Sequence, residues 1–132
     1  MIVVDTNVIA YLAMPSPYTE AAERLLLREP DWAAPLLWRS EFRNVLSLYL
    51  RKGLIRFEEA LEIQEEMELL FHGKEYDVAS LDVLSLVNQS DCSAYDCEFV
   101  ALAKGLGVRL VTMDRKLVSC FPHIAVLLTE AA

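Results

Sequence analysis

Short apolar runs alternate with longer stretches of helical periodicity along the whole chain. Most of these runs span only a few residues and are rich in β-branched side chains, which is typical of buried strands. We predict strands over residues 2–4, 31–35, 75–78, 108–112 and 125–128.

Between these strands, apolar residues recur at spacings of three and four positions and predict helices. Ser16 and Pro17 are typical of a helix start, with serine as the cap. We predict helices over residues 17–28, 37–52, 56–72, 80–88 and 93–104. Glycines that end helices follow three of these segments: Gly53, Gly73, and the pair Gly105 and Gly107.

Strands that alternate with helices indicate an α/β sandwich around a mainly parallel sheet. No linker or repeat divides the chain, so we expect residues 1–132 to form one domain. In such sheets, binding sites form at the carboxyl ends of the strands. Asp5 follows the first strand directly, and Asp114 lies two residues beyond Thr112. We therefore expect both carboxylates at that edge.

Composition excludes several other classes of protein. The chain is 55% apolar and lacks the run of about 20 apolar residues that a membrane helix needs, and it begins with no basic leader. Three cysteines without a C-x-x-C pair form no disulfide framework, which suits a reducing cytoplasm. The net charge is −8, but residues 56–82 alone contribute −7. The acidity is therefore mostly that of one helical region, and the remaining surface is close to neutral.

Glu41 lies at an inward position of its predicted helix. It shares a stripe with Trp38, Val45 and Leu48, where a carboxylate is costly unless it is paired or bound to a cation. Asn44, one turn later, is positioned to hydrogen-bond with it. The structural alternative is an edge carboxylate that pairs with Arg39 or Arg43.

Asp96 repeats this pattern beside Phe99, Val100 and Ala103. Its structural alternative is a capping box with Ser93. Asp5 and Asp114 have similar alternatives as N-caps of helices that begin next to them. Each acid thus has a structural explanation. Capping alone does not explain why all four acids are predicted at inward helix positions or at strand ends.

If the four carboxylates converge, they form an all-oxygen cage of the kind that Mg²⁺ or Mn²⁺ prefers. Zinc is not expected, because His72 and His123 are isolated and lack a ligand spacing. The cysteines are expected to pack as small apolar residues. They are Cys92, Cys97 and Cys120. No catalytic serine or cysteine grouping and no glycine-rich phosphate loop is present.

These acids, in this order, resemble the motifs of PIN-domain ribonucleases. VVDTNV at residues 3–8 resembles the opening of the family, and Glu41 with NVL at 44–46 resembles its second motif. YDC at 95–97 resembles the third, although alanine usually follows the aspartate, and LVTMD at 110–114 resembles the fourth. Order, spacing and length together resemble VapC-type toxins over essentially the whole chain.

The resemblance implies a PIN fold, a three-layer α/β/α sandwich around a mainly parallel sheet of about five strands. It also implies an endoribonuclease that uses one or two Mg²⁺ or Mn²⁺ ions, forms a homodimer or larger assembly, and is inhibited by a small antitoxin. The acids carried over are Asp5, Glu41, Asp96 and Asp114, as both catalytic residues and metal ligands. The polar residues expected around them are Thr6, Asn7, Asn44 and Thr112.

Two features depart from the pattern or lie outside it. Some family members carry a further acid just after the fourth aspartate, whereas Arg115 and Lys116 follow here, which puts in doubt how tightly a second ion is held. Asp91 has no fixed place in the motif and is interpreted as a loop or helix-start residue, with a peripheral role in the site left open.

Bases near the four acids are expected to contact RNA phosphates. They are Arg39, Arg43, Arg115 and Lys116. The predicted helices over 17–28 and 37–52 carry more leucines than one buried stripe needs. These extra leucines favour a homodimer interface or an antitoxin groove, or else they complete the core.

Two other functions remain open at this point. A catalytically silent PIN-like assembly module would keep the fold without the chemistry. A receiver-like signalling domain also has an acidic Mg²⁺ pocket, but no lysine follows the last predicted strand here. A phosphatase of the haloacid-dehalogenase type needs D-x-D after the first strand, where this chain has Asn7 in place of the second acid.

Overall fold

The computed structural model describes residues 1–132 and contains one five-stranded sheet. Its strand order is β3-β2-β1-β4-β5, and every neighbouring pair is parallel. The strands are β1 (Ile2–Val4), β2 (Trp32–Pro35), β3 (Glu75–Tyr76), β4 (Leu110–Thr112) and β5 (Ala125–Leu127). The predicted α/β class and the parallel sheet are therefore confirmed.

Eight helices connect and follow the strands. They are α1 (Thr6–Ala13), α2 (Thr19–Arg28), α3 (Leu37–Arg51), α4 (Phe57–Leu70), α5 (Ser80–Asn88), α6 (Ala94–Leu106), α7 (Arg115–Cys120) and α8 (Leu128–Ala131). All five predicted helices are present, and α5 has the predicted bounds.

The start of α2 differs from its prediction. The helix begins at Thr19 rather than at Pro17, because the Thr19 hydroxyl donates to the carbonyl oxygens of Tyr11 and Met14 and so closes a turn after α1. Gly105 lies inside α6, and Gly107, with φ of +68°, ends that helix. Of the two glycines expected to end α6, Gly105 and Gly107, only Gly107 adopts the left-handed conformation that favours glycine.

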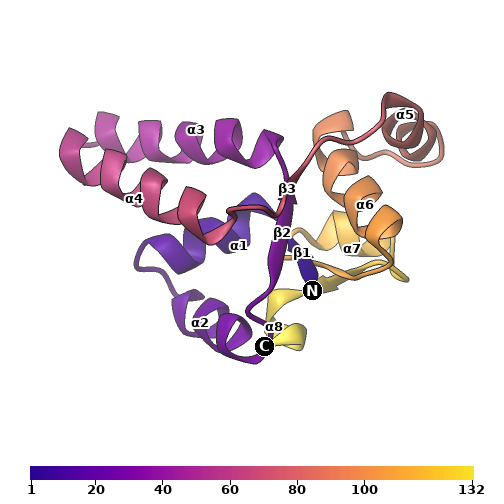
Figure 1. The fold of residues 1–132 in the computed structure, drawn as a ribbon, viewed down its shortest axis with the longest axis horizontal. Helices are drawn as coiled ribbons and strands as arrows, with labels where there is room; N and C mark the ends of the chain where they lie inside the picture. Colours follow the sequence, from indigo (N-terminus) through magenta and orange to yellow (C-terminus); the bar gives the residue numbers. More distant parts are fainter.

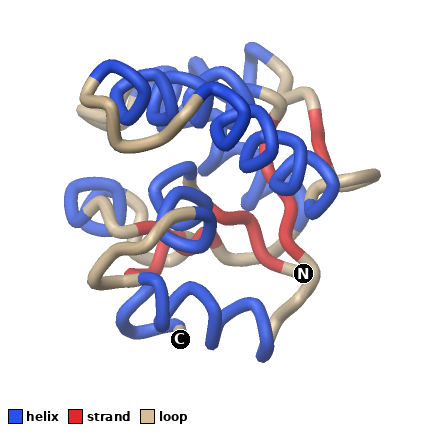
Figure 2. The backbone as a smooth tube through the Cα atoms, turned by 90° about the vertical axis from the view of Figure 1, so that its left-hand side faces the viewer, coloured by secondary structure: helices blue, strands red, loops and turns tan.

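The sheet lies between two layers of helices. Figure 1 shows α1, α2, α3 and α4 on one side of the strands and α5, α6 and α7 on the other. The helix pair α3 and α4 extends beyond the edge of the sheet as a hairpin, and Figure 2 shows this hairpin above the strands with α2 below them. The structure is thus the expected three-layer α/β/α sandwich.

The core is a cluster of 32 buried apolar residues that includes all three residues of β1. Since β1 and β4 are central and covered on both faces, all their side chains are buried without alternation, and Thr112 is the one polar residue among them. No helix is long and apolar enough to cross a membrane.

The order of the strands determines where polar residues can gather. The neighbours β1 and β4 end at the same edge, where Asp5 and the turn before α7 follow them. Helix α3 starts at this edge too, directly after β2. A polar site at this edge therefore draws on segments that are more than 100 positions apart in the sequence.

Candidate carboxylate site

Asp5 is the most constrained of the four acids. Its side chain is only 7% exposed. Oδ1 accepts a hydrogen bond from the Thr6 amide at 2.8 Å, and Oδ2 accepts one from the Thr112 hydroxyl at 2.7 Å. Asp5 caps α1, as one interpretation of the sequence proposed, and its second oxygen is held from β4. Capping and a site position coexist in this residue.

Asn7 and Thr112 fasten the turn that carries Asp114. Thr112 Oγ1 accepts from the Asp114 amide at 3.0 Å and from Asn7 Nδ2 at 3.5 Å, and Asn7 Oδ1 accepts from the Met113 amide at 3.3 Å. These bonds fix the path of the chain from β4 into α7 beside α1. Both residues therefore hold the turn that leads from β4 to Asp114.

Glu41 reaches across from α3 to α1. Its Oε1 accepts a hydrogen bond from Thr6 Oγ1 at 2.7 Å, and it forms no ion pair with Arg39 or Arg43. The structural alternative proposed for Glu41 is therefore wrong.

The expected bond from Asn44 is also not formed. Asn44 is exposed and accepts from Ser47 within its own helix. Thr6, buried at the start of α1, takes the role that sequence spacing had assigned to Asn44.

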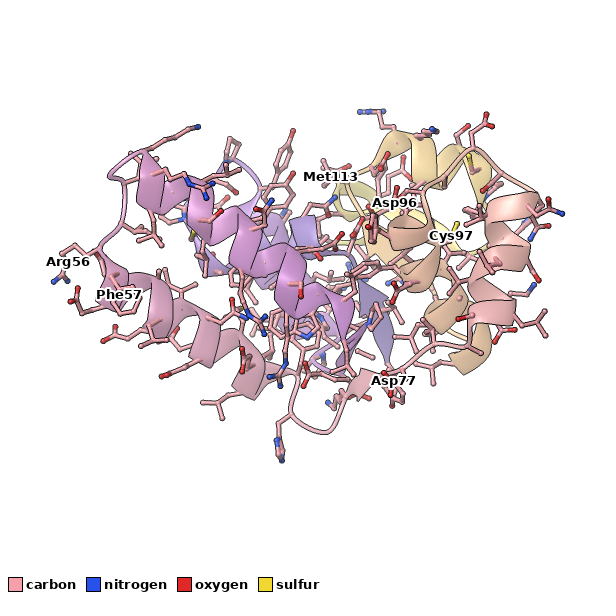
Figure 3. All side chains as sticks on the ribbon, turned by 90° about the horizontal axis from the view of Figure 1, so that it is seen from above. Arg56, Phe57, Asp77, Asp96, Cys97 and Met113 are labelled. Carbon is pink, nitrogen blue, oxygen red and sulfur yellow. The ribbon has the colours of Figure 1, made fainter.

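Asp96 lies in the first turn of α6, on the opposite side of the sheet from Glu41. Ser93 caps this helix, because its Oγ accepts from the Asp96 amide at 3.1 Å. The reciprocal bond, in which the Ser93 amide would donate to the Asp96 carboxylate, is not formed. Only half of the predicted capping box therefore exists. The carboxylate is half-buried and points toward the turn that holds Met113 (Figure 3).

Negative charge accumulates among these groups, and none of them forms an ion pair. Burial raises the pKa of Asp5 to about 6, against the hydrogen bonds from Thr112 and Thr6, and the charges of Asp96 and Glu41 raise it further. Burial is also the main reason that the pKa values of Glu41 and Asp96 are raised, with the charge of Asp96 adding to the first and that of Asp114 to the second. The four acids therefore form one electrostatically coupled group at the carboxyl edge of the sheet.

Asp114 caps α7, as the second N-cap interpretation proposed. Its Oδ1 accepts from the amides of Lys116 at 2.9 Å and Leu117 at 3.3 Å. The other oxygen, Oδ2, makes no hydrogen bond, so the carboxylate retains a free acceptor. Asp91, whose role was open, contributes through its backbone, because its carbonyl oxygen accepts from Lys116 Nζ at 2.9 Å.

The donor chemistry of the group fits a hard divalent cation, because it consists of carboxylates that form no ion pair. In this conformation, no three acidic, imidazole or thiol groups lie close enough together to hold a metal ion. An ion held here by Asp5, Glu41, Asp96 and Asp114 would therefore need small side-chain movements. It would also relieve the mutual repulsion of these carboxylates.

The predicted RNA-contacting bases differ in their surroundings. Arg39 is engaged elsewhere, since it donates to both oxygens of Glu75 at 2.6 and 2.7 Å and to Glu68 at 3.0 Å. Arg43 is exposed and lines the groove between α3 and α4. Arg115 and Lys116 are exposed in the first turn of α7. The structure thus ties Arg39 to β3 and α4 rather than leaving it free beside Glu41.

Glu98 is an acid near the site that sequence reasoning missed. Burial raises the pKa of Glu98, and its charge raises the pKa of Glu41. It follows Asp96 by two positions, so it falls off the inward stripe of α6 on which the prediction relied. Its effect on Glu41 is exerted between two different helices, α6 and α3, and no local spacing indicated this.

A sequence model of the PIN domain family matches residues 2–125. The chain is also similar to Ribonuclease VapC3 of Pyrobaculum aerophilum, with 34% identity over 126 residues. That alignment covers 93% of this chain and 96% of the relative.

Solved structures of low sequence identity share the fold. PAE2754 from Pyrobaculum aerophilum has a TM-score of 0.77 at 22% identity, with 98% of this chain and 91% of that chain covered. FitAcB from Neisseria gonorrhoeae has a TM-score of 0.70 at 21% identity, with 96% of both chains covered. These likenesses extend over the same sandwich that holds the carboxylates at its edge.

Proposed function

The chain belongs to the PIN domain family, and on that basis we propose that it is a divalent-metal-dependent endoribonuclease, the toxin of a VapBC-type toxin–antitoxin pair. The observation that carries the proposal is the coupled group of Asp5, Glu41, Asp96 and Asp114. These acids come from four separate segments, and their charges act on one another at one edge of the sheet without forming an ion pair. The name of the 34% identical relative, a ribonuclease, supports RNA as the substrate.

The residues of the chain have distinct tasks in this proposal. Asp5, held through both oxygens, and Asp96, in the first turn of α6, are the main ligands of Mg²⁺ or Mn²⁺. Glu41, oriented by Thr6, and Asp114 position the attacking water. When bound, the ion neutralises phosphate charge and lowers the pKa of that water.

The carboxylates also handle the proton. A carboxylate whose pKa is raised accepts a proton from water more readily than an ordinary one, and Glu41 is such a group. The water, which has given a proton to Glu41, attacks phosphorus in line with the bond to the 3′ oxygen. That bond breaks, and the 3′ oxygen takes up a proton from solvent and leaves as a hydroxyl. The products are a 5′-phosphate and a 3′-hydroxyl end. Exposed Arg43 and Arg115 are the candidates for holding the flanking phosphates, whereas the Lys116 ammonium, also predicted to contact RNA, already donates to the Asp91 carbonyl oxygen.

A small antitoxin is the proposed protein partner. The groove between α3 and α4 has a volume of about 410 Å³, is lined by Leu46, Leu50 and Leu61, and carries Glu65 and Glu68 at its side. Apolar walls with acidic residues beside them suit an apolar segment that also carries basic residues. An arginine from such a segment would pair well with the carboxylate site. We also propose that the chain forms a homodimer or larger assembly and that it acts on RNA in the cytoplasm.

The decisive experiment is cleavage of RNA by the purified chain. We expect activity with Mn²⁺ or Mg²⁺, none with EDTA, and recovery when Mn²⁺ is added back. An Asp5→Asn, Asp96→Asn double variant that is folded but inactive serves as the control against a contaminating nuclease. If the wild-type chain is folded and binds its antitoxin but cleaves no RNA with either ion, the assembly-module alternative replaces the enzyme.

A further inference from the structure

Lys116 is tied to the acidic site through three separate segments. Its backbone amide donates to Asp114 Oδ1 at 2.9 Å, and its ammonium donates to the Asp91 carbonyl oxygen at 2.9 Å. Its charge also lowers the pKa of Asp96. The side chain is therefore not a free surface lysine, because one of its three donors is fixed and the ammonium is held near Asp96.

The position of this lysine is unfavourable for its own helix. The first turn of α7 contains Arg115 and Lys116 and no acid. Positive charges at a helix start oppose the partial positive charge of the unpaired amides. Arg115 makes no hydrogen bond or ion pair, whereas Lys116 makes a defined contact. A locally unfavourable charge that is held in place indicates that it serves the site rather than the helix.

Charge balance suggests what it does there. The four carboxylates carry a formal charge of −4, and none of them forms an ion pair. Two divalent ions would neutralise them fully. One divalent ion and one fixed ammonium leave a single negative charge. A second divalent ion on the Asp96 and Asp114 side would have to approach the ammonium against strong repulsion.

We propose that Lys116 is a built-in cation of the carboxylate group, so that the site takes up one divalent ion and excludes a second. This inference rests on the proposed metal-dependent function and deepens it. Lys116 acts through the acids beside it and is a positioning residue, while Asp91 acts through its backbone to hold the ammonium in place.

Calorimetric titration of the metal-stripped chain with Mn²⁺ tests the proposal without using activity. Wild type should bind one ion per chain. Lys116→Gln should bind Mn²⁺ at least about tenfold more tightly, because a repelling charge is removed, and Lys116→Glu should bind a second ion. The matched control is Arg115→Gln with Arg115→Glu, in the same exposed turn but without contacts, which should keep one ion and change its affinity less than about twofold.

A structural role alone would change melting temperature but not the number of ions. Two ions in wild type, or Lys116 variants that match the Arg115 variants, would overturn the inference. RNA cleavage, measured on the same wild-type sample, separates the two proposals. RNA cleavage by a wild-type chain that binds two ions would contradict the proposed role of Lys116 and support the proposed enzyme activity. A wild-type chain that binds one ion but cleaves no RNA would support the proposed role of Lys116 and contradict the proposed enzyme activity.

Discussion

Thr6 and Glu41 are 35 positions apart, yet the Thr6 hydroxyl donates to Glu41 Oε1 at 2.7 Å and joins the start of α1 to α3. The preceding residue is Asp5, so one short segment supplies an acid of the site and orients a second acid. Thr6 itself is buried. Thr6 therefore links two of the four carboxylates that the proposed reaction needs, through its amide to Asp5 and through its hydroxyl to Glu41.

Replacing Thr6 with valine should reduce RNA cleavage about 10- to 100-fold, because a residue that orients a ligand typically has an effect of that size. The change preserves shape and removes only the donor. It should also cost about 1 kcal/mol of unfolding free energy. Thr6→Ser, which keeps the hydroxyl, should restore most of the cleavage, and a valine variant with wild-type activity would contradict the role of this bond.

The raised pKa of Asp5 makes the metal-free protein sensitive to pH. Its folded pKa of about 6 exceeds the ordinary value of 3.8, so the folded state holds this proton more tightly than the unfolded chain. The stability that this proton contributes is fully present below about pH 4 and is lost as pH rises through 6, by about 3 kcal/mol at most. Asp5→Asn should flatten this dependence in denaturant titrations without metal. An unchanged pH profile in that variant would assign the dependence to other groups.

Asp96→Asn should abolish cleavage while leaving the metal-free protein as stable as wild type or more so. It removes one charge from a repelling group, and the cap of α6 survives because Ser93 binds the backbone amide of residue 96. Ser93→Ala is the matched variant, and it should cost about 1 kcal/mol and keep cleavage. Melting curves and cleavage assays on both variants check this. The reverse pattern would make Asp96 a structural residue only.

Divalent ions should raise the melting temperature of wild type, since a ligand that binds only the folded state stabilises it. The gain should shrink strongly in Asp5→Asn, where a ligand charge is lost, and should remain in Ser93→Ala. Melting curves at rising Mn²⁺ concentration measure the effect. A shift of equal size in Asp5→Asn would place the bound ion elsewhere on the chain.

Arg39 and Arg115 should behave differently in RNA binding. Arg115→Ala should reduce the slope of log binding constant against log salt by about one, as expected for one lost phosphate contact. Arg39→Ala should leave that slope unchanged and lower stability by about 1–2 kcal/mol, because Glu75 loses two of its three donors. Binding is measured in EDTA to prevent cleavage. A reduced slope in Arg39→Ala would show that this arginine leaves Glu75 to contact RNA.

The sequence by itself determined the class of the fold and which strand ends are followed by an acid. Apolar runs too short for helices could only be buried strands, and helical spacing between them required a parallel sheet. The strand-end positions of Asp5 and Asp114 then followed, because parallel strands present their carboxyl ends at a common edge. These are local features, readable from a window of a few residues.

Only the tertiary structure decided which polar groups meet. Helical spacing assigned Asn44 to Glu41, but the bond comes from Thr6 on another helix. Proximity in sequence placed Arg39 beside the site, yet Glu75 and Glu68 bind it. Hydrogen bonds and ion pairs depend on the packing of segments far apart in the chain. Long polar side chains can also reach several partners, and the sequence does not show which partner each one binds. Periodicity fixes which face of a helix is buried, but only packing determines what that face touches.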